Sequence, residues 1–435
     1  MAYRLGDIDC VSARGHSALG GTLAIQAVWR YDCAVDMAAL TEFHAALRTG
    51  RLGRVVVAAM IPAAGDRWSA RAEFAPLEVA ETPIPRADLE TWIVEQGRAE
   101  LHTFGGPAWR LSVVNCDNGE SAVSLLASHT IADGLAFCDA IAEAVAGKAF
   151  DVRYSSDEFG RMRLLSGDFR DAARRGGALL KAVGLAAQLA VSRRGDTKAQ
   201  SDVDDRNFRL PTVDATVPAA QWHAAARARG GSATTLAVAV TAAIATEIGR
   251  TDEQGLARMI MPVSTRSDED RRANALASID FEVDLRDGAL TDLAPLRALI
   301  KEKLSAAVTT GQPAAPLIPI AVALPRVLFA VLVRKVAADA TVSVCSNLGE
   351  IDPAMLCIDG HPASTIRLGL VNQSLDSRTV LTERGGNLYV SLFESAGEIT
   401  LRANGFHPPK LVDAEQLAKV VQQVLAEYGL TAILE

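Results

Sequence analysis

Hydrophobic and polar residues alternate at two different periods along the first third of the chain. Residues 21–31 (GTLAIQAVWRY) have the apolar, β-branched composition of a strand, and residues 36–47 then place hydrophobic residues at helical spacing. Residues 109–115 (WRLSVVN) and 121–128 (SAVSLLAS) flank an Asn-Gly turn, which predicts a β-hairpin. Residues 134–145 then carry one apolar stripe at helical spacing. The pattern therefore predicts mixed helices and strands from the start of the chain.

The second half repeats this mixture after an interruption. Residues 151 to about 207 carry runs of Arg and Asp around one apolar helix, 177–191, as a long connector does. The remaining predicted helices are 88–102, 219–229, 232–248, 292–308 and 413–428, and the remaining strands are 257–263, 277–285, 341–346, 365–371, 387–394 and 398–403. Two α/β layers joined by a connector fit this order better than one doubly wound sheet.

One apolar run, 316–333 (PLIPIAVALPRVLFAVLV), approaches the length that spans a membrane. Pro319, Pro325 and Arg326 interrupt it, so the run predicts a broken helix that is buried or lies at the surface. The alternative is a lipid-facing patch that admits an apolar substrate and makes a peripheral membrane contact.

Composition narrows the functional classes. The 435 residues include 44 Lys plus Arg against 52 Asp plus Glu, a net charge of −8, which argues against nucleic acid as a partner. The six cysteines form no CxxC pair, so we expect buried thiols in a reducing compartment and no zinc ribbon. The first 21 residues lack the apolar core of a signal peptide, and this predicts a cytoplasmic protein.

One of the seven histidines stands in a setting suited to catalysis. No two histidines have metal-ligand spacing, so no metal site is expected, and the other six, including His16, fit ordinary structural roles. His129 follows the strand 121–128 directly, with Asp133 four residues on and Gly134 opening a helix. A loop at the end of a strand can present an imidazole to a cleft, where it can act as a general base.

The sequence His129-Thr-Ile-Ala-Asp133-Gly134 resembles the motif of the HxxxDG acyltransferases, which include chloramphenicol acetyltransferase, condensation domains, wax ester synthase/diacylglycerol acyltransferases and polyketide-associated acyltransferases. Four further segments resemble motifs of this superfamily in the same order, namely 106–110 (GPAWR), 231–236 (GSATTL), 260–266 (IMPVSTR) and 346–349 (SNLG). The chain departs from many relatives in having Ser128 where they have a second histidine. The resemblance implies an α/β fold (α+β two-layer) of two chloramphenicol-acetyltransferase-like lobes, 1–165 and 206–435, joined by a connector, 166–205, with the active-site channel between them.

The resemblance also implies roles for single residues. His129 would act as the general base, and Asp133 would pair with Arg266 and shape the loop rather than contact the histidine. Gly134 would permit a close approach of loop and helix. Ser346 and Asn347 would donate hydrogen bonds to the oxyanion of a tetrahedral intermediate, although a strand-end turn explains these two residues nearly as well.

The expected reaction moves an acyl group from a thioester of coenzyme A or of a phosphopantetheinyl carrier to a hydroxyl acceptor, without a tightly bound cofactor. An amide-forming, free-standing condensation-type enzyme with an amine acceptor and a non-catalytic protein that binds acyl carriers or lipids are the alternatives. A metal hydrolase is disfavoured. An acidic protein that binds coenzyme A or an acyl carrier protein would need a local basic patch. Arg174, Arg175, Lys181, Arg193 and Arg194 are candidates, and a solvated charged face explains them equally.

Overall fold

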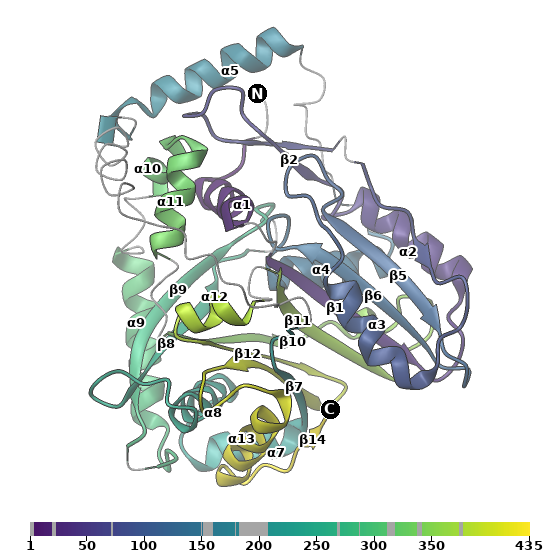
Figure 1. Ribbon diagram of the computed structural model, residues 1–435, viewed down its shortest axis with the longest axis vertical. Helices are drawn as coiled ribbons and strands as arrows, with labels where there is room; N and C mark the ends of the chain where they lie inside the picture. The colour runs from purple at the N-terminus through teal and green to yellow at the C-terminus, as the bar shows by residue number, and fades with distance from the viewer. Residues whose placement is uncertain are drawn as a thin grey trace.

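The structure is a computed structural model that describes residues 4–19, 23–70, 73–148, 150, 160–178, 180–181, 208–267, 270–286, 288–310, 318–336, 342–373 and 377–435. Two large β-sheets with helices on their faces dominate it (Figure 1).

The first sheet is built mainly from the N-terminal part of the chain. Its strand order is β11-β1-β6-β5-β4, with β1 Leu23–Tyr31, β4 Glu78–Val79, β5 Trp109–Asn115, β6 Ser121–Ser128 and β11 Thr365–Asn372. All neighbours are antiparallel except β4 and β5. Every residue of the central strand β6 is buried, because helices cover both faces of the sheet. A two-stranded sheet, β2 Val55–Val57 with β3 Arg67–Ser69, lies beside it.

The helices of this lobe divide between the two faces of its sheet. On one face, α2 (Met37–Thr49) and α4 (Gly134–Val145) pack against alternate strand residues such as Trp29 and Leu125. On the other face, α3 (Leu89–Gly97) packs against Val28 and Ala122. The predicted strands, hairpin and helix α4 are confirmed, whereas the predicted helix 88–102 is shorter and follows a 3₁₀ turn, η1 (Arg86–Asp88).

The second sheet comes from the C-terminal part of the chain, in the order β14-β7-β13-β12-β10-β8-β9. These strands are β7 Thr212–Pro218, β8 Leu256–Ser264, β9 Leu276–Asp284, β10 Ser343–Glu350, β12 Asn387–Ser395, β13 Glu398–Phe406 and β14 Ile433–Leu434. β10 runs parallel to both of its neighbours, and the other pairs are antiparallel. The predicted strands of this half are thus confirmed, and β7 and β14 are additional.

One helix, α8 (Ala233–Glu247), forms the centre of the second lobe. It is apolar on nearly all sides, as a fully buried helix must be, and its many alanines let it lie close to β8 and β10. α7 (Ala219–Ala228), α9 (Ala294–Thr310) and α13 (Ala414–Glu427) pack around it. The shorter elements are η5 (Pro353–Leu356) and α12 (Arg378–Glu383). The predicted helices of this half are confirmed to within a few residues.

Strand β11 belongs to the first sheet, although it lies within the predicted lobe 206–435. It pairs with β1 along the whole of its length, from Leu23 opposite Asn372 to Arg30 opposite Thr365. The chain therefore passes from the second sheet into the first and back again, and the boundaries of the two lobes along the sequence stay a prediction.

The apolar run 316–333 forms a broken helix within its described part, and it is only partly buried. Residues 318–333 lie in α10 (Ile318–Ala323) and α11 (Arg326–Val336), and both helices pack on α1 (Asp7–Leu19), which the sequence did not predict. Val322, Leu324 and Phe329 are buried there, whereas Val327 is 61% exposed, so the predicted broken helix is confirmed and lies partly in the interior and partly at the surface. None of the helices in the described part of the chain is long and apolar enough to cross a membrane.

The charged connector contains a helix that the sequence did not predict, α5 (Arg161–Arg174). Buried Asp168 ties it to the first lobe, because this carboxylate pairs with Arg4 at 2.8 Å and with Arg67. The predicted helix 177–191 and the arginines at 193 and 194 lie largely or wholly outside the described residues.

Candidate active site

The backbone of two neighbouring strands holds His129 in place. β6 ends at Ser128, whose N–H donates to the Ala108 carbonyl at 2.8 Å, and the His129 N–H donates to the Leu23 carbonyl at 2.8 Å. His129 is thus the first residue beyond a rigid, buried strand, and its side chain is half-buried. A loop that starts on such a strand can hold a catalytic group with little freedom.

Two side chains from other parts of the sequence orient the imidazole. Nδ1 of His129 lies 3.0 Å from Oδ1 of Asn274, in the segment before β9. The Asn274 side-chain nitrogen and its backbone N–H donate to the same oxygen of Asp9, Oδ1, at 3.1 and 3.0 Å. That Asp9 oxygen accepts twice, so the amide oxygen of Asn274 faces the histidine. An amide oxygen only accepts, and therefore Nδ1 carries the proton and Nε2 is the free base.

Burial lowers the pKa of His129 below its usual 6.5, although the nearby Asp133 charge and the Asn274 hydrogen bond act in the opposite direction. The imidazole is consequently neutral at neutral pH, which is the form that can take a proton. A hydroxyl placed at Nε2 would meet a base that needs no prior deprotonation.

Both carboxylate oxygens of Asp133 accept hydrogen bonds from groups other than His129. Oδ1 accepts from the Ala136 N–H at 2.8 Å and so caps α4, while Oδ2 accepts from Arg266 at 2.7 Å and from the Ala275 N–H at 2.8 Å. The Asp133 side chain is fully buried, and the Arg266 side chain is almost fully buried. The structure thus brings the two residues together as a buried ion pair that ties the histidine loop to the segment between β8 and β9.

Gly134 lies where the histidine loop contacts the other lobe. A Cβ atom at this position would stand 2.7 Å from Cδ2 of Leu348 on β10. Only glycine, which has no Cβ atom, leaves room for Leu348 here. This close approach explains why glycine follows Asp133 in the sequence.

A cavity of about 240 Å³ opens beside His129, between the two sheets. Ser346 and Asn347 line it together with His129 and Gly134, so four of the six predicted site residues surround one space, while Asp133 and Arg266 lie behind the loop. The other lining residues are mostly apolar and come from β1, α4, β8, β9, β10, β11 and β12: Leu23, Ile25, Leu135, Phe137, Cys138, Pro262, Ser264, Leu276, Leu348, Leu368, Gly369, Leu370, Tyr389 and Ser391.

The polar groups of this cavity differ in how far they are already engaged. Asn347 donates to Thr234 at 3.0 Å and accepts from the Gly349 N–H at 2.8 Å. Ser346 hydrogen-bonds Tyr389. Burial raises the pKa of Tyr389 to about 12, although the bond to Ser346 acts in the opposite direction. The buried hydroxyl of Ser391, opposite Ser346 in the sheet, has no hydrogen-bond partner among the described residues. Ser391 is thus a hydroxyl that a bound substrate can satisfy, and the sequence did not single it out.

His16 is a second imidazole near the candidate base. Its Nδ1 lies 3.1 Å from the Thr130 hydroxyl, and this hydroxyl also accepts from Ser128 at 3.0 Å. Burial, and to a lesser extent His129, lowers the pKa of His16 to about 3. Ser128 is fully buried, and the imidazole near His129 comes from α1.

A second hollow is lined by Asn274 and not by His129. It has a volume of about 360 Å³ and is lined by Gly6, Asp7, Ile8, Asp9, Arg272, Asn274, Ile318 and Pro319. Its charged lining contrasts with the mostly apolar cavity beside His129. The two hydrogen-bonded residues thus line two hollows of different character, His129 the apolar one and Asn274 the charged one.

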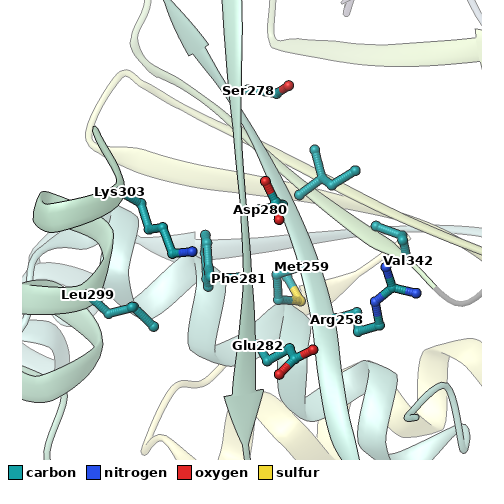
Figure 2. Close-up of a pocket in the computed structure, with 10 residues that line it drawn as sticks. Arg258, Met259, Ser278, Asp280, Phe281, Glu282, Leu299, Lys303 and Val342 are labelled. Atoms are coloured by element: carbon teal, nitrogen blue, oxygen red, sulfur yellow. The ribbon is translucent and has the colours of Figure 1, made fainter. Parts of the chain in front are cut away.

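A larger hollow, about 770 Å³, lies on the second lobe along β8, β9 and α9 (Figure 2). Lys303 and Leu299 reach it from α9, and Arg258 from β8 on the opposite side (Figure 2). The residues that line it include no histidine or cysteine, and none of the predicted site residues. Among the described residues, no group of three His, Cys, Asp or Glu side chains could hold a metal ion. The cavity beside His129 is accordingly the candidate active site.

No protein-family model matches the chain, and no curated protein sequence matches it. The first condensation domain of the calcium-dependent antibiotic synthetase, in complex with a substrate analogue, superimposes with a TM-score of 0.60 at 14% identity, over 100% of this chain and 99% of that one. Polyketide synthase associated protein 5 from Mycobacterium tuberculosis gives a TM-score of 0.55 at 13% identity, over 98% and 99% of the two chains. The nonribosomal peptide synthetase FmoA3 gives 0.58 at 18% identity, over 99% of this chain and 44% of that one.

The chain has a condensation-domain fold. Structures with this fold consist of two chloramphenicol-acetyltransferase-like lobes, so the predicted α/β, two-lobed architecture is confirmed. The condensation-domain fold also explains why residues as far apart as His129 and Ser346 line one cavity: each lobe contributes one wall.

Proposed function

We propose that the protein is an acyltransferase that moves an acyl group from a thioester to a hydroxyl acceptor, with His129 as general base. The observation that supports this most directly is the state of the imidazole. Its Nδ1 is engaged by Asn274, its pKa is lowered, and it lines a cavity between the lobes, so Nε2 is the nitrogen left for a substrate.

The reaction needs one proton shuttle and no covalent enzyme intermediate. Nε2 of His129 takes the proton of the acceptor hydroxyl as the hydroxyl oxygen attacks the thioester carbonyl carbon. The carbon–oxygen bond forms, the carbon–sulfur bond breaks, and the leaving sulfur receives the proton from His129 as a thiol. Atoms and charges balance without a further reactant.

The cavity holds hydroxyl and amide groups for the oxyanion that forms on the carbonyl. Ser391 has an unused hydroxyl, whereas Ser346 and Asn347 already have partners and would have to share or exchange them. We therefore place Ser391 first among the candidate donors. Such a donor, where it has been removed from other enzymes, is worth about 3–4 kcal/mol of barrier.

The cavity lined by His129 and the hollow lined by its partner Asn274 suit two reactants. The apolar cavity would take the acyl chain or an apolar acceptor, and the charged one would admit the other reactant. A thioester of coenzyme A or of a phosphopantetheinyl carrier would be the co-substrate, and the mechanism requires no resident cofactor.

Amide formation is the second candidate function, because condensation domains are among the structures that share the fold. The same base serves an amine and a hydroxyl, so a screen of matched alcohols and amines with one acyl thioester decides between ester and amide products.

The test follows free-thiol release from acyl-coenzyme A in the presence of alcohol acceptors. We expect His129→Ala to lower kcat by about 10²–10⁴-fold, the usual contribution of a general base. His223→Ala is the matched control, because that histidine pairs with Glu394 on the surface of the second lobe and should leave turnover unchanged.

Undiminished turnover in His129→Ala would exclude His129 as the base. A wild-type protein that binds an acylated carrier but releases no thiol with any acceptor would instead support the non-catalytic alternative.

A further inference from the structure

Helix α5 exposes a stripe of large hydrophobic side chains. Met162, Leu165 and Phe169 are 79%, 40% and 70% exposed, and their spacing of three and four residues places them on one side of the helix. An amphipathic helix normally buries such a stripe against its own protein. Here the stripe faces outward, which indicates a partner outside the fold.

The opposite side of α5 is firmly anchored, so this exposure is built in. Asp168 is fully buried, pairs with Arg4 at 2.8 Å and accepts the Met60 N–H at 2.8 Å. Asp171 accepts the Gly65 N–H at 2.9 Å, three residues along the same side. Because Asp171 is two residues and about 200° around the helix from Phe169, its anchoring contact turns the apolar stripe away from the protein.

Positive charge borders the apolar stripe. α5 contains four arginines against two aspartates, and both aspartates are used in the anchoring contacts. Arg170, Arg174 and Lys181 are exposed. The chain as a whole has a net charge of −8, so the positive charge of this surface is opposite in sign to the net charge of the protein. An apolar stripe with arginines beside it complements a surface that is negatively charged outside and apolar beneath.

We propose that α5 is an interfacial helix that docks the protein on a bilayer of anionic phospholipids. The helix is the outermost element at its end of the molecule, where it forms a ridge (Figure 1). None of the hollows described above is lined by Met162, Leu165 or Phe169. A projecting ridge of single side chains inserts readily into a fluid bilayer, whereas a folded protein partner would have to offer a matching groove. This proposal does not depend on acyl transfer.

Vesicle flotation tests the proposal with the full chain. We expect the wild-type protein to float with vesicles of equimolar phosphatidylcholine and phosphatidylglycerol, and to stay behind with phosphatidylcholine alone or at high salt. Met162→Ser and Phe169→Ser should each weaken binding about tenfold, because each removes a large apolar side chain from the bilayer. The triple variant Arg170→Gln/Arg174→Gln/Lys181→Gln should weaken binding to anionic vesicles by at least as much.

Two control variants match these changes elsewhere on the surface. Val79→Ser/Ile433→Ser removes two exposed apolar side chains, 52% and 69% exposed, on β4 and β14. Arg227→Gln/Arg297→Gln/Lys301→Gln removes three exposed positive charges from α7 and α9. Both controls should bind vesicles as the wild type does. The exposed positions should leave the melting temperature of every variant near that of the wild type.

A wild-type protein that does not float with anionic vesicles would overturn the proposal, as would equal losses in the α5 variants and their controls. Binding to a purified acidic acyl carrier protein that needs Met162 and Phe169, without binding to vesicles, would assign the stripe to a protein partner instead. As an independent readout, Phe169→Trp should gain quenching by brominated lipid, and an unquenched added tryptophan would also count against the proposal.

Discussion

Burial keeps the imidazole of His129 neutral, and Asn274 decides which nitrogen is free. These two effects act on the pKa in opposite directions, since burial lowers it and the hydrogen bond raises it. A base whose pKa lies below 6.5 is deprotonated throughout the neutral range. Turnover should therefore persist below pH 6.5 and decline only at a more acid pH, where the imidazole binds a proton.

Asn274→Ala tests the positioning role of Asn274. Loss of the Nδ1 acceptor should lower kcat by up to about tenfold, the usual worth of one neutral hydrogen bond, with little change in KM. It also removes an interaction that favours the charged imidazole, so the acid limb of the kcat/KM profile should move to lower pH. The measurement is the pH profile of thiol release in the variant and the wild type.

Asn118→Ala, at the exposed turn between β5 and β6, is the control and should leave the profile in place. A purely structural role for Asn274 predicts lower activity with an unmoved acid limb. That result would contradict the orientation of His129 by Asn274.

Sequence alone singles out the residues whose chemistry stands in a local motif. His129, Asp133 and Gly134 are adjacent in the chain, and Arg266 follows from a resemblance. Asn274 lies 145 residues from His129, and no local pattern distinguishes it from other asparagines. Ser391 offers a faint signal, as a polar residue inside the apolar strand β12, but its lack of a partner becomes visible only in three dimensions.

At the scale of elements, the start of α4 is where the two lobes contact each other. The Asp133 side chain caps the helix, and Gly134 leaves room for Leu348 of β10. Gly134→Ala would place a methyl group 2.7 Å from Cδ2 of Leu348, which also lines the cavity. We expect a loss of about 1–3 kcal/mol in the free energy of unfolding and a higher KM, because the displaced leucine moves into the substrate space.

Gly134→Ala/Leu348→Ala should recover much of both losses, since the second change restores the space. Gly160→Ala is the matched control, because a Cβ atom there meets nothing within 4 Å. Denaturant unfolding and KM for the acyl thioester measure the two effects. A double variant no better than Gly134→Ala would show that the contact with Leu348 is not the reason for the glycine.

Elements with a local sequence signal could be predicted, whereas elements held by residues far away in the sequence could not. The β5–β6 hairpin follows from its Asn-Gly turn and α4 from its stripe, and both match the structure residue for residue. α1 and α5 escaped prediction because groups far away in the sequence hold them in place. α1 packs on α10 and α11, and α5 is held by Arg4 and Arg67. The membership of β11 in the first sheet likewise depends on β1, more than 300 residues earlier in the chain.

Over the whole molecule, charged residues join the two sheets beside β11. Asp214 of β7 accepts two hydrogen bonds from Arg402 of β13, at 2.7 and 2.6 Å, and lies 3.6 Å from Arg367 of β11. Arg367 also pairs with Glu90 of α3 at 3.0 Å. Gly369, on β11, leaves the space that the Arg402 side chain occupies. A carboxylate of one lobe is thus shared between arginines of both lobes, which couples their stability.

Arg402→Leu should destabilise the whole molecule by about 3–5 kcal/mol at neutral pH, because it leaves the buried Asp214 carboxylate without its main partner. Burial alone would raise the pKa of Asp214, but Arg402 and, less strongly, Arg367 hold it below its usual value. In the wild type the ionised Asp214 stabilises the fold at neutral pH. This stabilisation is lost as the pH falls from about 3.9, the ordinary pKa of an aspartate, to the lower pKa of Asp214 in the folded protein. In Arg402→Leu the carboxyl can take a proton, so the deficit should shrink as the pH falls toward 4.

Urea unfolding at several pH values measures this deficit. Arg286→Leu, which removes the exposed partner of Asp284, should leave the free energy of unfolding almost unchanged and serves as the control. Asp214→Asn/Arg402→Leu should be more stable than Arg402→Leu at neutral pH, because no buried charge remains. A deficit that stays constant with pH, or a double variant that is no more stable, would mean that Arg402 acts through packing and not through the charge of Asp214.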